Sequence, residues 1–283
     1  MCRLAFYIGP EIRISSLVTE PDNSIISQSY QSKEGKEPLN GDGFGLAWYV
    51  PNLSRDPALF RDISPAWSNQ NLLNVTRMVE SGCILVHVRA ATAGLPVIQV
   101  NCHPFKWKQF AFMHNGSIGG FYKMRRTLQQ KLSDEAYNVI LGSTDSEYAF
   151  ALFIDHYQRL SRHKEPLDAL IEGTRDTIDD LESLRSATET DEVSWLNFVI
   201  TNGKESVISR FISSETENSA SLYYREGSLY VCNSGCCHME DDRPKKAVLV
   251  ASEPLSEEPG WRSIDNNHLL IIHADRSTEL QAI

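Results

Sequence analysis

The chain lacks long apolar runs and any excess of positive charge. No segment approaches the roughly 18 apolar residues that a membrane-spanning helix needs. Lys and Arg together number 27 against 37 Asp and Glu, so the formal net charge is −10. This charge would be repelled by a nucleic-acid backbone or an anionic membrane surface. We therefore expect neither nucleic acid nor membrane among its partners.

The start of the chain also lacks the pattern of a secretory signal peptide. Arg3 interrupts an apolar start that ends by Gly9-Pro10, and no small-residue cleavage site follows. We therefore expect a cytoplasmic protein, in which thiols stay reduced. On this basis we expect free thiols at all the cysteines, which are Cys2, Cys83, Cys102, Cys232, Cys236 and Cys237.

Several enzyme motifs are missing too. The chain has no G-x-S-x-G elbow, no phosphate loop ending in G-K-[ST], no H-E-x-x-H and no G-x-G-x-x-G. Residues 232–238 place four soft ligands within seven positions, but zinc sites usually need two separated ligand pairs. We interpret this segment as a cysteine-rich loop, with metal or redox chemistry as the alternative.

Apolar periodicity predicts helices and strands in clusters. Three- and four-residue spacing across 167–184 predicts an amphipathic helix, and Thr144 with Glu147 has capping-box spacing. Other predicted helices cover 23–30, 69–80 and 121–132. Short apolar runs predict strands at 4–8, 46–50, 83–88, 110–113, 195–201, 207–212, 221–224, 229–232, 247–251 and 269–273. Because the two types do not alternate strictly, we expect an α+β fold with mainly antiparallel sheet, and a single domain over residues 1–283.

Cys2 follows the initiator methionine directly, and a small second residue permits removal of that methionine. An N-terminal cysteine would carry both a thiol nucleophile and an α-amine with a pKa near ~7.7–8, which can act as a base. The alternative is a small buried cysteine that opens a strand. Position alone favours this alternative.

Polar residues at the ends of predicted strands are further candidates. Arg89 could bind a carboxylate through its planar fork, or reach to the surface. Asn115 and the N–H of Gly116 could form an oxyanion hole, although Asn-Gly is also a hairpin turn signal. Asp145 could bind an ammonium group or stabilise a helix start, and His103 could be a ligand or a structural histidine.

The motifs form a recognisable order. They are Met1-Cys2-Arg3, Asn40-Gly41-Asp42-Gly43-Phe44-Gly45, Val88-Arg89-Ala90-Ala91-Thr92-Ala93-Gly94, Asn101-Cys102-His103-Pro104-Phe105, Phe112-Met113-His114-Asn115-Gly116 and Ser143-Thr144-Asp145-Ser146-Glu147. This order resembles the class II glutamine amidotransferases, which are N-terminal-nucleophile hydrolases. The chain is similar to their stand-alone branch, which includes the amidase of ergothioneine synthesis and glutathione-degrading amidotransferase-like subunits. The late segment Ala251-Ser252-Glu253-Pro254-Leu255 also fits that branch.

The resemblance implies a four-layer αββα sandwich of two mainly antiparallel sheets, and it implies a role for each candidate. Cys2 matches the nucleophile, exposed once Met1 is removed. Asn115 and Gly116 match the oxyanion hole. Arg89 matches the arginine that binds the substrate α-carboxylate, and Thr92 lies beside it. Asp145 matches the carboxylate that binds the substrate α-ammonium group. His103 matches a family histidine near the substrate.

The implied activity is hydrolysis of the γ-amide of glutamine or of a γ-glutamyl compound through a thioester on Cys2. Such chemistry requires no metal and no organic cofactor. One alternative is a glutaminase subunit that supplies ammonia to a separate synthase, so a synthase or hydrolase partner subunit is expected in that case. An alternative from another class is a non-catalytic binding protein that retains Met1.

Overall fold

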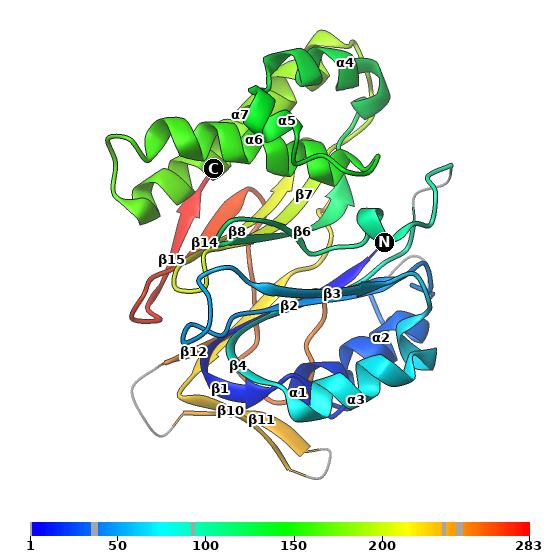
Figure 1. Ribbon diagram of the computed structural model, residues 1–283, viewed down its shortest axis with the longest axis vertical. Helices are drawn as coiled ribbons and strands as arrows, with labels where there is room; N and C mark the ends of the chain where they lie inside the picture. The colour runs from blue at the N-terminus through cyan, green and yellow to red at the C-terminus, as the bar shows by residue number, and fades with distance from the viewer. Residues whose placement is uncertain (1, 35–38, 92–93, 234–235, 242–245) are drawn as a thin grey trace.

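A computed structural model describes residues 2–34, 39–91, 94–233, 236–241 and 246–283 (Figure 1). Two large antiparallel sheets lie face to face at its centre. The first sheet runs in the order β13 (Arg262–Ser263), β9 (Tyr223–Gly227), β12 (Ala247–Ala251), β1 (Arg3–Arg13), β4 (Glu80–Val88), β2 (Phe44–Trp48) and β3 (Ala58–Asp62). The second runs in the order β15 (Thr278–Ala282), β14 (His268–Ile272), β8 (Ser206–Ile212), β7 (Trp195–Thr201), β6 (Phe110–Ser117) and β5 (Phe105–Trp107).

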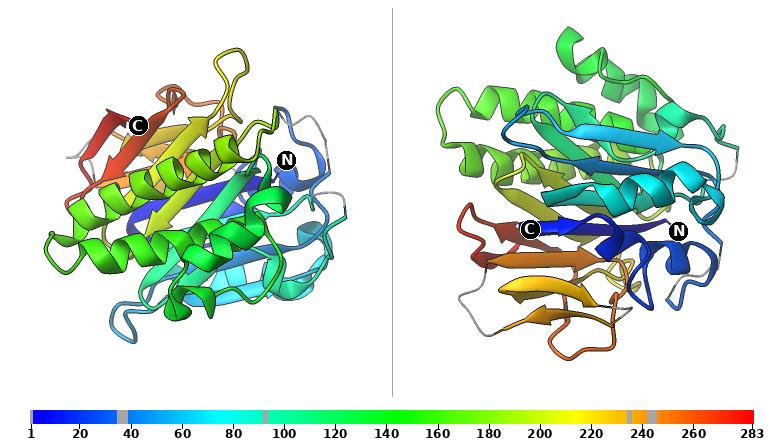
Figure 2. Two further views of the ribbon diagram at one scale, coloured as in Figure 1. Left: turned by 90° about the horizontal axis from the view of Figure 1, so that it is seen from above. Right: turned by 60° about the horizontal axis from the view of Figure 1, so that its bottom comes forward.

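Helices cover the outer face of each sheet. The first sheet is covered by α1 (Ser15–Val18), α2 (Ile25–Tyr30) and α3 (Gln70–Met78), whose apolar residues share a buried cluster with it. The second is covered by α4 (Phe121–Lys131), α5 (Asp134–Tyr137), α6 (Asp145–Leu160) and α7 (Pro166–Ala187) (Figure 2). Short 3₁₀ helices η1 (Ala66–Ser68) and η2 (Gln99–Asn101) lie in connections. The four-layer αββα sandwich is therefore confirmed.

Side chains of β1 show how the layers are built from the sequence. Leu4, Phe6 and Ile8 belong to the apolar cluster between the two sheets. Ala5 and Tyr7 belong to the cluster on the opposite face, under the helices. Successive side chains of a strand point to opposite faces, so a strand buried on both faces is apolar at consecutive positions. This alternation fixes which residues look into the space between the sheets.

Two predicted strand ends were wrong. Gly9-Pro10 does not end β1, which continues to Arg13 with an irregularity in its pairing between Ile8 and Ile12. Asn115-Gly116 is not a hairpin turn, because β6 runs through it and Asn115 lies opposite Asn197 of β7. Pairing with a distant strand has overridden the local turn signal in both places.

Helix starts agree well with the predicted caps. Ser24 caps α2, accepting from the N–H of Ser27. α6 begins at Asp145 with the complete capping box of Thr144 and Glu147. Such caps satisfy the unpaired N–H groups of the first turn. They hold Asp145 at a defined place at the end of the second helical layer.

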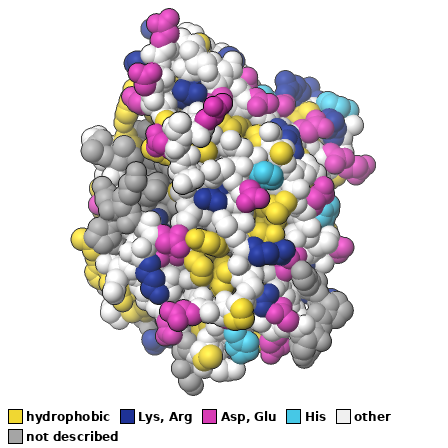
Figure 3. All heavy atoms as spheres, turned by 180° about the vertical axis from the view of Figure 1, so that it is seen from behind, with side chains coloured by type: hydrophobic (Ala, Val, Ile, Leu, Met, Phe, Trp, Pro, Cys, Tyr) yellow, Lys and Arg dark blue, Asp and Glu magenta, His cyan; other side chains and the backbone are white. Residues whose placement is uncertain are grey.

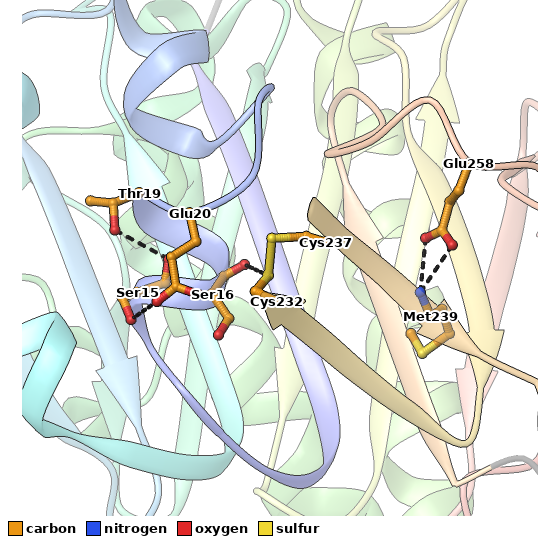
Figure 4. The surroundings of a disulfide bond; sticks show 8 residues. All are labelled: Ser15, Ser16, Thr19, Glu20, Cys232, Cys237, Met239 and Glu258. Carbon is orange, nitrogen blue, oxygen red and sulfur yellow. Dashed lines mark hydrogen bonds between the residues drawn. A yellow bond between two sulfur atoms is a disulfide. The ribbon is translucent and has the colours of Figure 1, made fainter. Parts of the chain in front are cut away.

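The predicted cysteine-rich loop is a β-hairpin, and the expectation of reduced thiols throughout was wrong. Its strands are β10 (Leu229–Asn233) and β11 (Cys236–Glu240). Antiparallel pairing places Cys232 opposite Cys237 with their Cα atoms 4.0 Å apart, and the two form a disulfide beside the carbonyl of Ser16 (Figure 4). Glu20 approaches both sulfur atoms, but sulfurs joined in a disulfide are not thiolate ligands. Cys2, Cys83, Cys102 and Cys236 are free thiols.

Charge is distributed over the surface without separation by sign on the face seen in Figure 3, where acidic and basic side chains are interspersed. Among the described residues, no helix has both the length and the apolar character required to cross a bilayer.

Candidate active site

Strand alternation gathers polar side chains at one end of the space between the sheets. Leu4, Met113, Val199 and Val250 all belong to the apolar cluster between the sheets. Two positions along the chain from each of these apolar residues lies a polar residue, whose side chain points to the same face of the sheet. Those polar residues are Cys2, Asn115, Asn197 and Ser252.

Arg89 joins the same group from the neighbouring strand. Leu85 of β4 lies in the cluster between the sheets, and His87 and Arg89 follow at two-residue steps. Arg3 lies opposite Val88, so Cys2 and Arg89 come next at the edge of the paired region. Three predicted site residues, Cys2, Arg89 and Asn115, are thereby brought to one place by the pleat of three strands.

The Cys2 thiol is half-buried and sits against Ala90. Its Sγ accepts from the Ala90 N–H at 3.4 Å and donates to the Ala90 carbonyl at 3.5 Å. Burial raises the pKa of the thiol, while the Ala90 N–H and the charges of Arg89 and Arg3 oppose the rise. A thiol with a raised pKa is protonated at neutral pH, so nucleophilic attack by Cys2 would require a base.

Arg89 is a buried cation without a complete set of partners. Its side chain is 3% exposed, and Nη1 has no hydrogen-bond partner in the described part of the chain. Its backbone is held by the segment that precedes β2, since Arg89 N donates to Gly43 O and Asp42 N donates to Arg89 O. Asp42 also accepts from Ala91 N at 2.8 Å, a contact that sequence reasoning missed. An unpaired buried guanidinium nitrogen is suited to an anionic ligand.

Asn115 and Gly116 lie side by side within β6. Asn115 is fully buried; its Nδ2 donates to Ser252 Oγ at 3.2 Å, and its Oδ1 has no partner among the described residues. A Cβ at Gly116 would lie 1.8 Å from the Trp195 carbonyl oxygen. Position 116 therefore excludes any side chain, because the Trp195 carbonyl occupies that space.

Asp145 ties the start of α6 to the segment after β6. Its Oδ2 accepts from Ile118 N and its Oδ1 from Ser146 N, each at 2.8 Å. His114, next to Asn115, reaches the same helix start through Ser146 Oγ at 2.9 Å. Oδ1 also accepts from Ser146 Oγ at 3.3 Å, whereas Oδ2 can accept a second hydrogen bond and so has room for an ammonium donor.

His103 is packed among aromatic rings. Its ring centroid lies 4.4 Å from that of His87 and 4.4 Å from that of Phe105. Burial holds its pKa well below the ordinary value, so the ring is neutral. Both ring nitrogens are buried without a hydrogen-bond partner among the described residues, so the role of His103 stays a prediction. Thr92, the remaining predicted residue, lies outside the described residues.

Sequence reasoning missed a buried ion pair next to the nucleophile. Arg3 Nε lies 2.8 Å from Glu253 Oε1, and Arg3 Nη1 donates to the Cys2 carbonyl at 2.8 Å. Ser32 Oγ and the N–H groups of Lys33 and Glu34 also donate to Glu253. Burial alone would raise the pKa of Glu253, but these donors and Arg3 bring it below its ordinary value. The signal that could have indicated this ion pair was the presence of Arg3 and Glu253 in the quoted motifs, next to Cys2 and Ser252.

A cavity of about 320 Å³ lies beside these residues. It is lined by Arg3, which follows the nucleophile, and by Trp195, which contacts Gly116. Glu34 and residues 217–221 complete its wall, and Cys2, Arg89 and Asn115 do not line it. Ala220 in this wall accepts from Asn197, the residue opposite Asn115. The cavity thus borders both the first and the second sheet at the end where the polar group lies.

Known proteins were compared with the whole chain. The family profile of the class II glutamine amidotransferases matches residues 16–282. "Probable glutamine amidotransferase DUG3" of Saccharomyces cerevisiae is 41% identical over 292 residues, covering 96% of this chain and 82% of the relative. A gamma-glutamyl-hercynylcysteine sulfoxide hydrolase of Mycobacterium tuberculosis is 26% identical over 271 residues, covering 95% and 92%.

Solved structures agree with this result. A glutamine aminotransferase class-II domain protein from Silicibacter pomeroyi superimposes with a TM-score of 0.69 at 27% identity, over 99% of both chains. The glutamine phosphoribosylpyrophosphate amidotransferase of Bacillus subtilis superimposes with a TM-score of 0.60 at 16% identity, covering 99% of this chain and 49% of that one. The second likeness shows the fold alone, and it agrees with the four-layer αββα sandwich. The chain belongs to the class II glutamine amidotransferases.

Proposed function

We propose that the chain hydrolyses the amide bond of a γ-glutamyl compound, with Cys2 as the nucleophile once Met1 is removed. The observation that carries the proposal is the convergence of Cys2, Arg89 and Asn115 on one end of the space between the sheets. The similarity to a gamma-glutamyl-hercynylcysteine sulfoxide hydrolase supports this substrate class. The family profile begins at residue 16 and does not cover Cys2, so the proposal for the nucleophile is supported by its place beside Arg89 at the end of the inter-sheet space.

The Cys2 thiol attacks the γ-carbonyl carbon, and its proton passes to the α-amine of the same residue. A base is needed because burial raises the thiol pKa, and an α-amine titrates near ~7.7–8. Asn115 and the N–H of Gly116 stabilise the oxyanion of the tetrahedral intermediate. Collapse of this intermediate breaks the C–N bond, releases the amine with the transferred proton, and leaves a thioester that water hydrolyses.

Recognition of the glutamyl head uses two opposite charges. The unpartnered Arg89 Nη1 binds the α-carboxylate, and Asp145 accepts from the α-ammonium group. Compounds lacking either charge leave a polar partner unpaired and are rejected.

We infer that a γ-glutamyl conjugate is preferred over glutamine itself. The similarity to a gamma-glutamyl-hercynylcysteine sulfoxide hydrolase supports this preference. Turnover of γ-glutamyl amino acids or peptides is therefore expected to exceed that of glutamine. Comparison of kcat/KM across such a series measures this preference.

The decisive experiment concerns Cys2. Mass spectrometry of the purified protein should show that Met1 is absent, and Cys2→Ala and Cys2→Ser should each reduce amidase activity by at least about 10³-fold. Cys236→Ser is the matched control, because Cys236 is a free and exposed thiol. Full activity in Cys2→Ala would rule out the mechanism, as would labelling of another cysteine by an electrophilic glutamine analogue.

A further inference from the structure

We propose that Ser252 is a positioning residue that orients the Asn115 amide for oxyanion binding. This inference rests on the proposed function and gives a role to a residue that touches neither substrate nor nucleophile. Ser252 directly follows β12 and is fully buried. Its hydroxyl joins the strand of the nucleophile in the first sheet to the oxyanion strand in the second.

Four hydrogen bonds fix Ser252 in place. Its N–H donates to the Leu4 carbonyl at 3.0 Å, and its carbonyl accepts from Ser221 Oγ at 2.8 Å. Its Oγ accepts from the Leu4 N–H at 3.1 Å and contacts the Asn115 amide at 3.2 Å. Leu4 is two residues from Cys2, so a single oxygen atom sets the spacing between the nucleophile strand and Asn115.

The two orientations of the Asn115 amide differ in the hydrogen bonds that they form with the Ser252 hydroxyl. When Nδ2 faces Ser252, Oγ accepts two hydrogen bonds and Asn115 Oδ1 is buried without a partner in the described part of the chain. A 180° turn of the amide exchanges its nitrogen and oxygen at almost no steric cost. Ser252 O–H then donates to Oδ1 while Leu4 N–H still donates to Oγ.

The turn gives partners to both the Asn115 Oδ1 acceptor and the Ser252 hydroxyl proton, and Nδ2 becomes the buried group that is left for the oxyanion to pair. It also brings Nδ2 to the side of the amide away from Ser252. The Asn115 side chain points into the space between the sheets, at the end where Cys2 lies. The turned Nδ2 therefore becomes the oxyanion donor. With the opposite orientation an oxygen would face the oxyanion and repel it.

A double-mutant cycle tests whether Ser252 acts through Asn115. We expect Ser252→Ala to lower kcat by at least about tenfold with KM changed less than threefold, because the amide loses the partner that selects its direction. Asn115→Ala should lower kcat by about 10²–10³-fold. The double variant should equal Asn115→Ala, since Ser252 has no other route to the reaction. Multiplicative losses in the cycle would overturn the inference.

Ser209→Ala is the matched structural control. Ser209 is fully buried in β8, where its hydroxyl accepts from the Phe198 N–H at 3.1 Å and donates to the Leu196 carbonyl at 2.7 Å. We expect its removal to lower the urea midpoint of unfolding about as much as Ser252→Ala does, while kcat stays near wild type. An equal fall of kcat in both variants would reduce Ser252 to a structural role.

Two further readouts separate this inference from the proposed function. Alkylation of Cys2 by iodoacetamide needs no oxyanion hole, so its rate should be unchanged in Ser252→Ala. Ser252→Thr keeps the hydroxyl and should recover most of the lost kcat if it folds to wild-type stability. Inactive Cys2→Ala together with fully active Ser252→Ala would refute the role of Ser252 alone, whereas active Cys2→Ala would refute the proposed function.

Discussion

Two buried arginines lie next to Cys2 and differ in how they are paired. Arg3 is 2% exposed, and Arg89 is 3% exposed. Arg3 forms an ion pair with Glu253 and donates to the Cys2 carbonyl. Arg89 Nη1 has no hydrogen-bond partner in the described ranges of the chain.

This difference separates a structural charge from a charge that is ready for a ligand. Burying a cation costs several kcal/mol unless an anion compensates it. For Arg3 the chain itself supplies the anion, and the pair holds the backbone at the nucleophile. For Arg89 the α-carboxylate of the substrate would complete the pair. Removing each partner should therefore affect different properties.

Arg89→Ala should produce the largest effect, on catalysis. We expect kcat/KM for a γ-glutamyl substrate to fall by about 10³-fold or more, which corresponds to about 4 kcal/mol, because the substrate carboxylate loses its partner. The unfolding free energy should not fall as it does in Glu253→Gln, since removing Arg89 relieves a buried charge that has no complete set of partners and leaves no buried ion unpaired. Steady-state kinetics and urea unfolding measure the two quantities.

A substrate without the α-carboxylate provides the control for Arg89. The wild-type enzyme should turn over such an analogue poorly, and Arg89→Ala should lower that residual rate little further. Arg89→Lys should recover only part of the activity, because an ammonium group cannot bind a carboxylate in the bidentate manner of a guanidinium. Equal losses on both substrates would show that Arg89 does not bind the carboxylate.

Glu253→Gln should have its main effect on stability. Neutralising this carboxylate leaves Arg3 buried without its anion, which typically costs about 3–5 kcal/mol. Urea unfolding at pH 7 measures the loss, and Arg89→Ala under the same conditions is the comparison. If Glu253→Gln were the more active and less stable variant, and Arg89→Ala the reverse, the assignment of the two arginines would hold. Similar stabilities for both variants would contradict it.

Local patterns in the sequence were sufficient for most elements of the fold. β7 and β12 have the predicted bounds, and α6 begins at the predicted capping box. The strands β3, β5, β11, β13 and β15 were missed because they are short or become strands by pairing with a neighbour. The Cys232–Cys237 disulfide was missed because it depends on the register of β10 and β11, whereas the expectation rested on compartment alone.

The site was predictable where strand alternation applies. Cys2 and Asn115 each lie two residues from a core residue of the inter-sheet cluster, so their common orientation follows from the sequence once the two strands are known. His87 and Ser252 obey the same alternation and could have been added in this way. The pairing of Arg3 with Glu253 could not, because it depends on which strands are neighbours in the first sheet.

Acidification should lower the unfolding free energy in two pH ranges, one set by the buried His87 between the sheets and the other by the Arg3–Glu253 pair. Its effect should be smaller than that of Arg89→Ala or Glu253→Gln. Burial lowers the pKa of His87 to about 3, well below its unfolded value near ~6.5. The unfolded chain therefore takes up a proton at His87 before the folded chain does. The stability contributed by neutral His87 is complete above about pH 6.5 and is lost as the pH falls from there toward 3. Glu253, whose pKa is lowered as well, loses its contribution only below the ordinary carboxyl range.

His87→Gln measures this contribution directly. The unfolding free energy of the wild type should fall between pH 7.5 and pH 5.0, and His87 should account for about 2 kcal/mol of the fall, at about 1.4 kcal/mol per pH unit below 6.5. The variant lacks this proton uptake, so its stability should fall by about 2 kcal/mol less over the same range, although it starts lower. Urea unfolding at a series of pH values gives both slopes. Parallel slopes would mean that His87 is protonated in the folded state, and the region between the sheets would then resist acid as well as the Arg3–Glu253 pair does.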